Sequence, residues 1–432
     1  MSQKTKQWGA IIVMIALFAM IAFVTNLCTP MATIIKNQGE ISNVLAQIGN
    51  YGNFVAYLVM GIPAGMLISK FGYKKTALIG LAVGCVGILI QWCSGLLDVE
   101  HNLGLVFGIY LLGAFIAGLC MCILNCVVNP MLNLLGGGGN SGNQLIQIGG
   151  VFNSTAAVCC YILMGALIAD ATKAKIADAT PALMIALAIF VIAFIVILFT
   201  KIEEPEQAPV EITLVKGAMS YRHFALGALA IFLYMGIEVG VPNYVLQYLT
   251  AAKVEGDPNA GFGISAGVAG LLVAVYWFMM LIGRFAGAAI GSKVSSRAMV
   301  TTVSIATLVL VLFGMFAPAD VLVEFPGVDW AKLELIWQEI PLGIFSFLLV
   351  GLCTSVMWGA IFNMAVEGLG KYTAIASGIF MTMVFGCAVM MAIQGAVADA
   401  TDYITSFWVV VFCAAYILFY ALVGSRVSKK EA

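Results

Sequence analysis

Twelve long apolar runs divide this 432-residue chain, and they restrict its fold more than any other feature does. A helix that crosses the hydrocarbon core of a bilayer needs about 20 predominantly apolar residues, and each run is close to that length or longer. Because lipid offers the backbone no hydrogen-bond partner, such runs are expected to form helices. The runs cover residues 9–34, 43–69, 76–95, 104–134, 143–169, 181–200, 223–249, 264–290, 299–317, 338–366, 373–398 and 405–424. The sequence therefore predicts an all-α membrane protein with twelve transmembrane helices.

The overall composition excludes the main soluble classes of protein. Hydrophobic residues make up 62 % of the chain and charged residues only 9 %, whereas about a quarter of the residues in a soluble domain are charged. The formal net charge of −1 provides no basic field for nucleic acid. The eleven cysteines lie almost entirely within the apolar runs, so we expect them to pack between helices and to form no disulfide framework or metal site.

Lysine and arginine residues are distributed unequally between the two sides of the predicted bundle. One side collects Lys4, Lys6, Lys70, Lys74, Lys75, Lys201, Lys216, Arg222, Lys293, Arg297, Lys371, Arg426, Lys429 and Lys430, against five on the other side. The other side carries acidic loops such as VDWAKLELIWQE at 328–339. Positively charged connections stay in the cytoplasm. We therefore expect both chain ends to be cytoplasmic and the protein to lie in the plasma membrane, which in a bacterium is the inner membrane.

Three short motifs recur in the same order in the two halves of the chain. FVTNLCTP (23–30) pairs with MGIEVGVP (235–242), NPMLNLLG (129–136) with NMAVEGLG (363–370), and GALIADAT (165–172) with GAVADAT (395–401). Each pair relates one apolar run to the run six places later. The sequence thus predicts two pseudo-symmetric six-helix bundles, 1–200 and 223–432, joined by a polar cytoplasmic linker over 201–222. Parallel six-helix halves with a binding site near the midplane are typical of the major facilitator fold.

Polar side chains inside the predicted helices identify a candidate binding site, because such residues usually face the bundle interior. The candidates are Asn26, Gln47, Asn50, Asn53, Asn125, Asn129, Asn133, Gln147, Asn153, Asn243, Tyr276, Trp277, Asn363 and Gln394. Amides both donate and accept hydrogen bonds, which suits a ligand covered in hydroxyl groups, and aromatic faces suit the C–H face of a pyranose. The helices of the first half contain no cation for a carboxylate substrate. A neutral sugar fits this set best, although any single amide is equally explained by helix packing, worth about 0.6 kcal/mol.

Two charged residues lie inside the predicted helices. Glu238 is about fifteen residues into the seventh run, and an ionisable group at that depth is a functional candidate; a protonated or hydrogen-bonded structural glutamate is the alternative. Arg284 lies nearer the cytoplasmic end of the eighth run, where pairing in a gate is favoured over ligand contact.

The loop GMLISKFGYKK at 65–75 resembles the GxLxDRxGR(K/R) loop between the second and third helices of major facilitators. Ser69 and Lys70 replace the usual Asp-Arg, and the second-half counterpart GAAIGSKVSSR (287–297) keeps only glycines and basic residues. Such a loop holds a cytoplasmic gate by pairing cations with helix ends. Without the aspartate, we expect a weaker latch around Lys70, or one that uses Arg284 and Glu367.

Longer stretches resemble the fucose/hexose permease branch of the major facilitator superfamily. These are YMGIEVGVPNYVLQYL (234–249), VYWFMMLIGRFAGA (275–288), FNMAVEGLGKYTAIASGIFM (362–381) and QGAVADA (394–400). The resemblance implies uptake of neutral sugars, commonly with a proton and in some members with sodium. It also implies an acid in the first and fourth helices of proton-coupled members. Here Asn26 and Asn125 match those positions, and amides do not exchange protons near neutral pH.

Two further positions bear on the resemblance. The family glutamine of the fifth helix is matched by Gly150, with Gln147 one turn earlier as a substitute, and the family acid of the seventh helix is kept as Glu238.

The sequence as a whole predicts a secondary transporter that imports a neutral monosaccharide (hexose, deoxyhexose or amino sugar) by alternating access. We predict coupling to a proton or sodium through Glu238. A facilitative uniporter, a carrier of nucleosides or drugs, and a non-transporting sugar sensor are the alternatives. The helices contain no nucleophile–base pair, metal cluster or cofactor loop, so we expect no enzyme and no cofactor other than a coupling ion. The expected partners are the sugar and the lipid bilayer, with a monomer as the functional unit.

Overall fold

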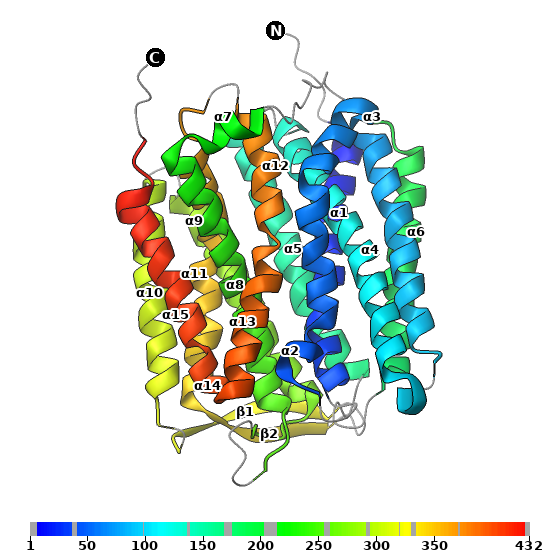
Figure 1. Ribbon diagram of the computed structural model, residues 1–432, viewed down its shortest axis with the longest axis vertical. Coiled ribbons are helices and arrows are strands. Elements are labelled where there is room, and N and C mark those ends of the chain that lie inside the picture. Colours follow the sequence, from blue (N-terminus) through cyan, green and yellow to red (C-terminus); the bar gives the residue numbers. More distant parts are fainter. Residues whose placement is uncertain are drawn as a thin grey trace.

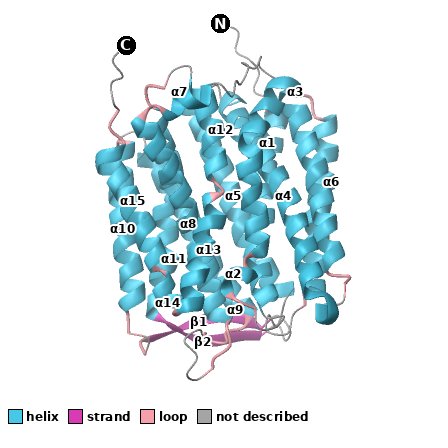
Figure 2. Ribbon diagram, viewed as in Figure 1, coloured by secondary structure: helices cyan, strands magenta, loops and turns pink. Residues whose placement is uncertain are grey.

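The computed structural model describes residues 7–36, 41–97, 99–135, 139–167, 175–202, 214–254, 260–290, 294–318, 320–329, 334–369 and 372–427. Within these ranges the chain is almost entirely helical, and its long helices run side by side as a bundle (Figure 1, Figure 2). The first part of the chain contributes α1 (Trp8–Lys36), α2 (Asn43–Ala46), α3 (Ile48–Ser94), α4 (Val99–Leu135), α5 (Gly139–Leu167), the 3-10 turn η1 (Ile176–Ala179) and α6 (Thr180–Phe199). We call this set the N-half.

The second part of the chain forms what we call the C-half. It contains α7 (Val215–Met219), α8 (Arg222–Thr250), α9 (Ala266–Ile290), α10 (Ser296–Phe316), β1 (Leu322–Asp329), β2 (Glu334–Pro341), α11 (Leu342–Val366), α12 (Thr373–Met383), α13 (Gly386–Ala400), α14 (Tyr403–Ser406), α15 (Trp408–Phe419) and the π-helical turn η4 (Tyr420–Gly424). Helix α7 lies within the predicted linker 201–222, of which residues 203–213 lie outside the described residues. The domain boundaries stay a prediction.

The number of membrane crossings agrees with the twelve predicted helices. Ten helices in the described ranges are apolar and long enough to cross a bilayer. One of them, α3, is 47 residues long and is broken at Gly72, whose φ of 79° favours glycine. A Cβ at Gly52, before the break, or at Gly87, after it, would meet the same stretch of α4, residues 111–117. The two arms are therefore antiparallel, so α3 crosses twice, and the shorter apolar stretch Ile148–Met164 of α5 completes the twelve.

The two halves repeat each other in helix length and in the capping of their helix ends. Helices α1 and α8, the first long helix of each half, both contain 29 residues. In the N-half, Nζ of Lys74 donates to the carbonyls of Leu198 and Thr200 at the end of α6, at 3.0 and 2.8 Å. In the C-half, Arg297 at the start of α10 donates to the Ser425 hydroxyl that follows η4, at 3.3 Å. A cation next to the C-terminus of a helix is stabilising, and the same device serves both halves.

The two ends of the bundle carry different structures. Helix α1 starts and η4 ends at one end, which we call the termini end (Figure 1). The hairpin β1–β2 lies across the other, which we call the hairpin end (Figure 1). The hairpin is antiparallel, with Asp329 opposite Glu334. It contains the segment that is predicted to be an acidic loop. The hairpin forms because Ile336, Gln338 and Ile340 alternate toward the bundle along β2.

Two sets of contacts between long helices make the most extensive connections between the halves. Helix α5 packs along α9, and α3 packs along α12 and α13. The approach is close because small residues lie at the crossings: a Cβ at Gly61 of α3 would lie only 2.7 Å from the backbone nitrogen of Thr382 on α12. The region between these two lines of contact is where the fold places a midplane site.

Candidate functional site

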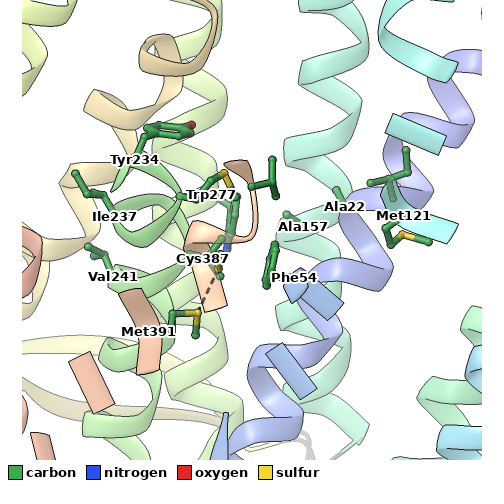
Figure 3. Close-up of a cluster of buried hydrophobic side chains, with 14 of the residues drawn as sticks. Ala22, Phe54, Met121, Ala157, Tyr234, Ile237, Val241, Trp277, Cys387 and Met391 are labelled. Atoms are coloured by element: carbon green, nitrogen blue, oxygen red, sulfur yellow. Dashed lines mark hydrogen bonds between the residues drawn. The ribbon is translucent and has the colours of Figure 1, made fainter. Parts of the chain in front are cut away.

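The halves face each other across a layer of side chains near the middle of the bundle, shown in Figure 3. Tyr234 and Ile237 of α8 lie on one side of this layer. Ala22 of α1 and Ala157 of α5 lie on the other side, and Trp277 of α9 stands between them. The side chains that the sequence predicts to bind a ligand lie at different distances from this central layer.

Two of the α4 asparagines are linked to each other and to α3. Nδ2 of Asn125 donates to the Tyr57 hydroxyl at 2.9 Å, and Nδ2 of Asn129 donates to the Asn125 carbonyl at 3.2 Å. Both asparagines are partly exposed, whereas Tyr57 is buried. The amides therefore border accessible space, with Tyr57 supporting them from behind. The Asn133 side chain lies outside the described residues.

Asn26 and Asn153 are fixed by backbone carbonyls of α1. Nδ2 of Asn26 donates to the Ala22 carbonyl one turn earlier, at 2.8 Å, and the side chain is buried. Nδ2 of Asn153 donates to the Phe18 carbonyl at 2.9 Å, which ties α5 to α1. The hydrogen bond of Asn26 to Ala22 lies within α1, whereas the hydrogen bond of Asn153 connects α5 to α1.

An aromatic cluster forms the corresponding part of the C-half. The Tyr234 hydroxyl donates to the Thr354 carbonyl on α11 at 3.2 Å, and the Tyr276 hydroxyl lies 3.1 Å from Oγ1 of the same threonine. The partly exposed Trp358 ring tilts against Tyr234, with their centroids 6.1 Å apart. Helices α8, α9 and α11 are thus joined by hydroxyl groups and present an aromatic wall. Tyr234 and Thr354 are functional candidates that the search for amides and charges did not find.

Glu238 lies one turn after Tyr234 on α8 and is partly exposed. Two groups act electrostatically on its carboxyl group, the guanidinium of Arg284 and the hydroxyl of Tyr234. An isolated charge at membrane depth is costly, and a nearby opposite charge lowers that cost. The Arg284–Glu238 relationship therefore joins α9 to α8 within the C-half.

Arg284 also crosses to the other half. Its Nη1 donates to the Gly150 carbonyl and, at 2.8 Å, to the Ser154 hydroxyl, with Oδ1 of Asn153 at 3.4 Å. All three acceptors belong to α5. Position 150 is a glycine, and a Cβ there would already stand 3.4 Å from Nη1. The cation thus binds the N-half where α5 and α9 pack together.

The alternative gate that uses Arg284 and Glu367 stays a prediction. Glu367 is the exposed C-cap residue of α11, and its carbonyl accepts a hydrogen bond from Nε2 of His223 at 2.8 Å. Lys70, the other predicted gate residue, is exposed, with its Nζ 5.3 Å from the centroid of the neighbouring Phe71 ring. Among the three predicted gate residues, all within the described ranges, Arg284 is the one that has hydrogen bonds to the other half.

A second contact between α5 and α9 is aromatic. The rings of Tyr161 and Trp277 stack with centroids 6.4 Å apart and planes 25° apart. Both side chains are buried, and Nε1 of Trp277 has no hydrogen-bond partner among the described residues. Buried indole N–H groups normally have one. Trp277 is therefore an interface residue with an unused donor.

Three predicted ligand residues lie toward the hairpin end instead of the central layer. Gln47 caps the start of α3, and its Oε1 accepts from Nδ2 of Asn50 at 2.7 Å; both side chains are fully buried. Gln394 is buried near the end of α13, where its Nε2 lies 3.5 Å from the Ser406 hydroxyl. These amides therefore lie within the packing at that end and not beside the central layer.

Asn53 does not share the face of Gln47 and Asn50. It lines a small cavity within the N-half together with Gln91 and Tyr110. Side chains three residues apart along a helix differ in direction by about 60°. Three such side chains in succession therefore do not all lie on one face of the helix. Asn363 is exposed on α11, and the Gln147 side chain lies outside the described residues.

Two amides of α8 are buried without partners. Asn243 has an exposed fraction of 0 % and Gln247 of 1 %, and in the described residues neither the amide nitrogen nor the oxygen of either side chain has a hydrogen bond. Buried polar groups are normally satisfied, so this is a strong sign of a site that binds water or ligand in some state. Asn243 is a predicted ligand residue. Gln247 was missed, although it lies one turn from Asn243 in the quoted motif.

Metal binding has no support in the described residues, where no group of three or more His, Cys, Asp or Glu side chains comes together. The chemistry that the interface offers is hydrogen bonding by amides and hydroxyls, aromatic stacking, and one acid that interacts electrostatically with one base.

Comparison with known proteins agrees with this architecture. The chain is 28% identical over 433 residues to the glucose/galactose transporter of Brucella abortus biovar 1 (strain 9-941), covering 98% of this chain and 96% of the relative. It is 21% identical to the L-fucose-proton symporter of Escherichia coli (strain K12), covering 95% and 92% of the two chains. The crystal structure of the transporter FucP in the outward conformation superposes with a TM-score of 0.67, at 20% identity, over 96% of this chain and 99% of that one.

A family model also matches more than half of the chain. Residues 11–256 match the model described as Major Facilitator Superfamily, which spans the N-half and the first long helix of the C-half. Together with the twelve crossings and the repeated halves, this match establishes the class: the chain is an integral membrane protein and belongs to the Major Facilitator Superfamily.

Proposed function

We propose that this protein is a secondary transporter that imports a neutral monosaccharide by alternating access. The observation that carries the proposal is the presence of two complementary groups: uncharged amides on α4 and α5 in the N-half and an aromatic cluster on α8, α9 and α11 in the C-half, with α5 packed along α9. Amides bind hydroxyl groups and aromatic faces bind the C–H face of a pyranose. Relatives that are named as glucose/galactose and L-fucose transporters support the same substrate class.

The ligand contacts that we propose are those nearest the central layer. Asn125, Asn129 and Asn153 supply amides from the N-half, and Tyr276 and Trp277 supply aromatic groups from the C-half. The unpartnered amides of Asn243 and Gln247 belong to the path toward the hairpin end. The remaining sequence candidates, which are Asn26, Gln47, Asn50, Gln147, Asn363 and Gln394, are kept as secondary contacts.

The orientation follows from the distribution of cations. Lys74, Arg222 and Arg297 lie at the termini end, so the positive-inside rule places that end in the cytoplasm. The hairpin end then faces the outside of the inner membrane, where a nutrient sugar arrives. We propose that a single chain in the bilayer is the functional unit and that no resident cofactor is needed.

Coupling is proposed to pass through Glu238 and Arg284. The guanidinium has partners in both halves: Glu238 on α8 and the Gly150, Asn153 and Ser154 group on α5. An ionised Glu238 attracts the cation toward the C-half. A proton or sodium ion at Glu238 removes that attraction, and Arg284 then binds α5 more strongly. Cation binding at one residue thereby changes how firmly the halves are joined, which is the requirement for coupled rocking.

Two alternatives differ from this proposal in a measurable way. If Glu238 is only structural, the protein is a facilitative uniporter and sugar equilibrates without accumulation. If the substrate is a nucleoside or a drug, free hexoses do not compete for uptake.

The test is uptake of radiolabelled glucose, galactose and fucose into proteoliposomes, with proton and sodium gradients imposed separately. We expect one sugar to accumulate above equilibrium with one of the two gradients. Equilibration under both gradients contradicts coupling, and absence of any saturable sugar flux contradicts the substrate assignment.

A further inference from the structure

The hairpin end holds a direct contact between the halves that the proposed sugar site does not use. The one-turn helix α2 packs against α13, although more than 350 residues separate them. The backbone nitrogen of Asn43 donates to Oδ1 of Asp399 at 2.7 Å, and that of Val44 donates to Oδ2 at 3.1 Å. One carboxylate therefore binds the first two amides of α2. Such amides have no partner within their own helix, and hydrogen bonds to an ionised acceptor are strong.

Two neighbouring features strengthen the contact. The Tyr403 hydroxyl on α14 donates to Oδ1 of Asn43 at 2.9 Å, and both side chains are buried. Gly395 lies one turn before Asp399, and a Cβ there would stand 3.2 Å from the Val44 nitrogen and 2.6 Å from the Tyr244 hydroxyl. Glycine at this position allows the two backbones to approach. We name the group of Asn43, Val44, Asp399 and Tyr403 the α2 latch.

The two sides of the α2 latch are each anchored to their own half. On one side, the Ser42 hydroxyl caps α2 by accepting from the Leu45 nitrogen at 3.2 Å, and α2 leads directly into α3. On the other side, α13 is held against α8 by the Tyr244 hydroxyl, which donates to the Met391 carbonyl at 2.7 Å. When the halves rotate relative to each other, the α2 latch must therefore stretch or break.

The closed packing of the hairpin end also has an unfavourable feature, which is the burial of polar groups without hydrogen bonds. Several polar atoms at this end are buried without hydrogen bonds among the described residues: Nε2 of Gln47, Oδ1 of Asn50, and Nε2 and Oε1 of Gln247. Burial of an unpartnered polar group is unfavourable, and water satisfies it when the region opens. The packing of these amides favours opening, and the α2 latch opposes it.

We propose that the α2 latch is the gate of the hairpin end, and that Asp399 is the positioning residue that holds this gate closed until the halves rotate. The proposal rests on alternating access as the proposed function, but it does not depend on which sugar is carried. Loss of the carboxylate shifts the population toward the state that is open at the hairpin end.

Hydrogen exchange of the backbone amides tests the contact without any substrate. The full-length protein is compared with Asp399→Ala and with Asp402→Ala. Asp402 is a matched control, because its carboxylate also accepts from a helix N-terminus, the Thr405 nitrogen at 2.8 Å, but within the C-half. We expect Asp399→Ala to speed exchange of the Asn43 and Val44 amides about 10-fold or more. Asp402→Ala is expected to speed exchange only around Thr405.

Two milder variants keep the test informative if Asp399→Ala folds poorly. Asp399→Asn keeps one acceptor oxygen, and Tyr403→Phe removes only the hydroxyl bonded to Asn43. Both are expected to give intermediate exchange rates in residues 41–47. Unchanged protection of these residues in Asp399→Asn and Tyr403→Phe overturns the proposal, as does an equal rise in exchange over all helices.

Transport provides the second arm of the experiment. In proteoliposomes, Asp399→Asn is expected to lower the apparent KM for sugar added at the hairpin end several-fold and to slow net uptake, because the open state is more populated. Asp402→Ala leaves both values unchanged. The same kinetics in the two variants contradict a gate role. Absence of sugar flux in the unmodified protein refutes the substrate assignment alone, since the exchange arm still reports on the α2 latch.

Discussion

Nη1 of Arg284 on α9 donates to the Ser154 hydroxyl on α5 at 2.8 Å, while the same guanidinium is the electrostatic partner of Glu238 on α8. A single cation therefore interacts with both halves of the molecule. A partly buried cation that interacts with two moving bodies responds to any change of charge on either one. This relationship leads to the first two predictions.

Replacement of Arg284 by lysine is expected to reduce transport about 10- to 100-fold, because the shorter lysine side chain does not carry its ammonium group to the position from which Nη1 binds both Gly150 and Ser154. The initial rate of sugar uptake in proteoliposomes measures the effect. Ser154→Ala removes only one acceptor and is the control, with an expected fall of less than 10-fold. Equal rates in Arg284→Lys and the unmodified protein would show that the bond between the halves is not needed.

Replacement of Glu238 by glutamine is expected to abolish accumulation against a gradient while sugar exchange continues. The amide keeps a hydrogen-bonding group beside Tyr234 but cannot bind a proton or attract Arg284. Concentrative uptake and equilibrium exchange are measured on the same proteoliposomes. Retained accumulation in Glu238→Gln contradicts the coupling role.

Replacement of Asn129 by alanine is expected to raise the KM for sugar about 5- to 10-fold, the effect of one lost hydrogen bond. Asn53→Ala is a suitable comparison, since it removes an amide of the same half that lines an internal cavity instead of the central layer. Its KM is expected to be unchanged. A rise in KM for both variants, or for neither, is inconsistent with Asn129 as a ligand residue.

Replacement of Gly61 by valine is expected to impair transport and to lower stability by about 1–3 kcal/mol, the usual range for overpacking. A Cβ there would overlap Thr382 on α12, so the halves are forced apart at this crossing. Gly108→Val on α4 is the control, because nothing lies within 4 Å of its Cβ position. Thermal unfolding and uptake are measured for both. Similar behaviour of the two variants would show that close approach at Gly61 has no role.

Much of the fold could be predicted because its determinants are local or periodic. Run length sets the number of crossings, as the twelve apolar runs show, and the recurring motifs give the repeat of the halves. The hairpin of β1 and β2 was not predicted, because 16 paired residues of mixed polarity resemble an acidic loop. The break at Gly72, in contrast, was predicted, because it lies in the loop GMLISKFGYKK between the runs 43–69 and 76–95.

The candidate site was predicted less completely. A list of polar residues in apolar runs finds Glu238, Arg284 and the asparagines of α4, because any polar group in lipid is conspicuous. The list does not show which of these side chains contact each other in the folded protein. Gln394 and Asn50 carry the same amide group as Asn125, yet they are buried at the hairpin end. Tyr57 and Tyr234 are ordinary membrane residues until their hydroxyl partners are known.

The sequence by itself determined that this chain lies in a membrane, how many times it crosses, and that its halves repeat, since hydrophobic length and internal similarity are properties of the linear chain. Only the tertiary structure decided that Arg284 binds α5, that Asp399 binds α2, and that Asn243 and Gln247 are buried without partners. The first two outcomes depend on contacts between residues at least 130 positions apart in the chain. Their geometry is set by how the two halves pack, and no local pattern of residues records it.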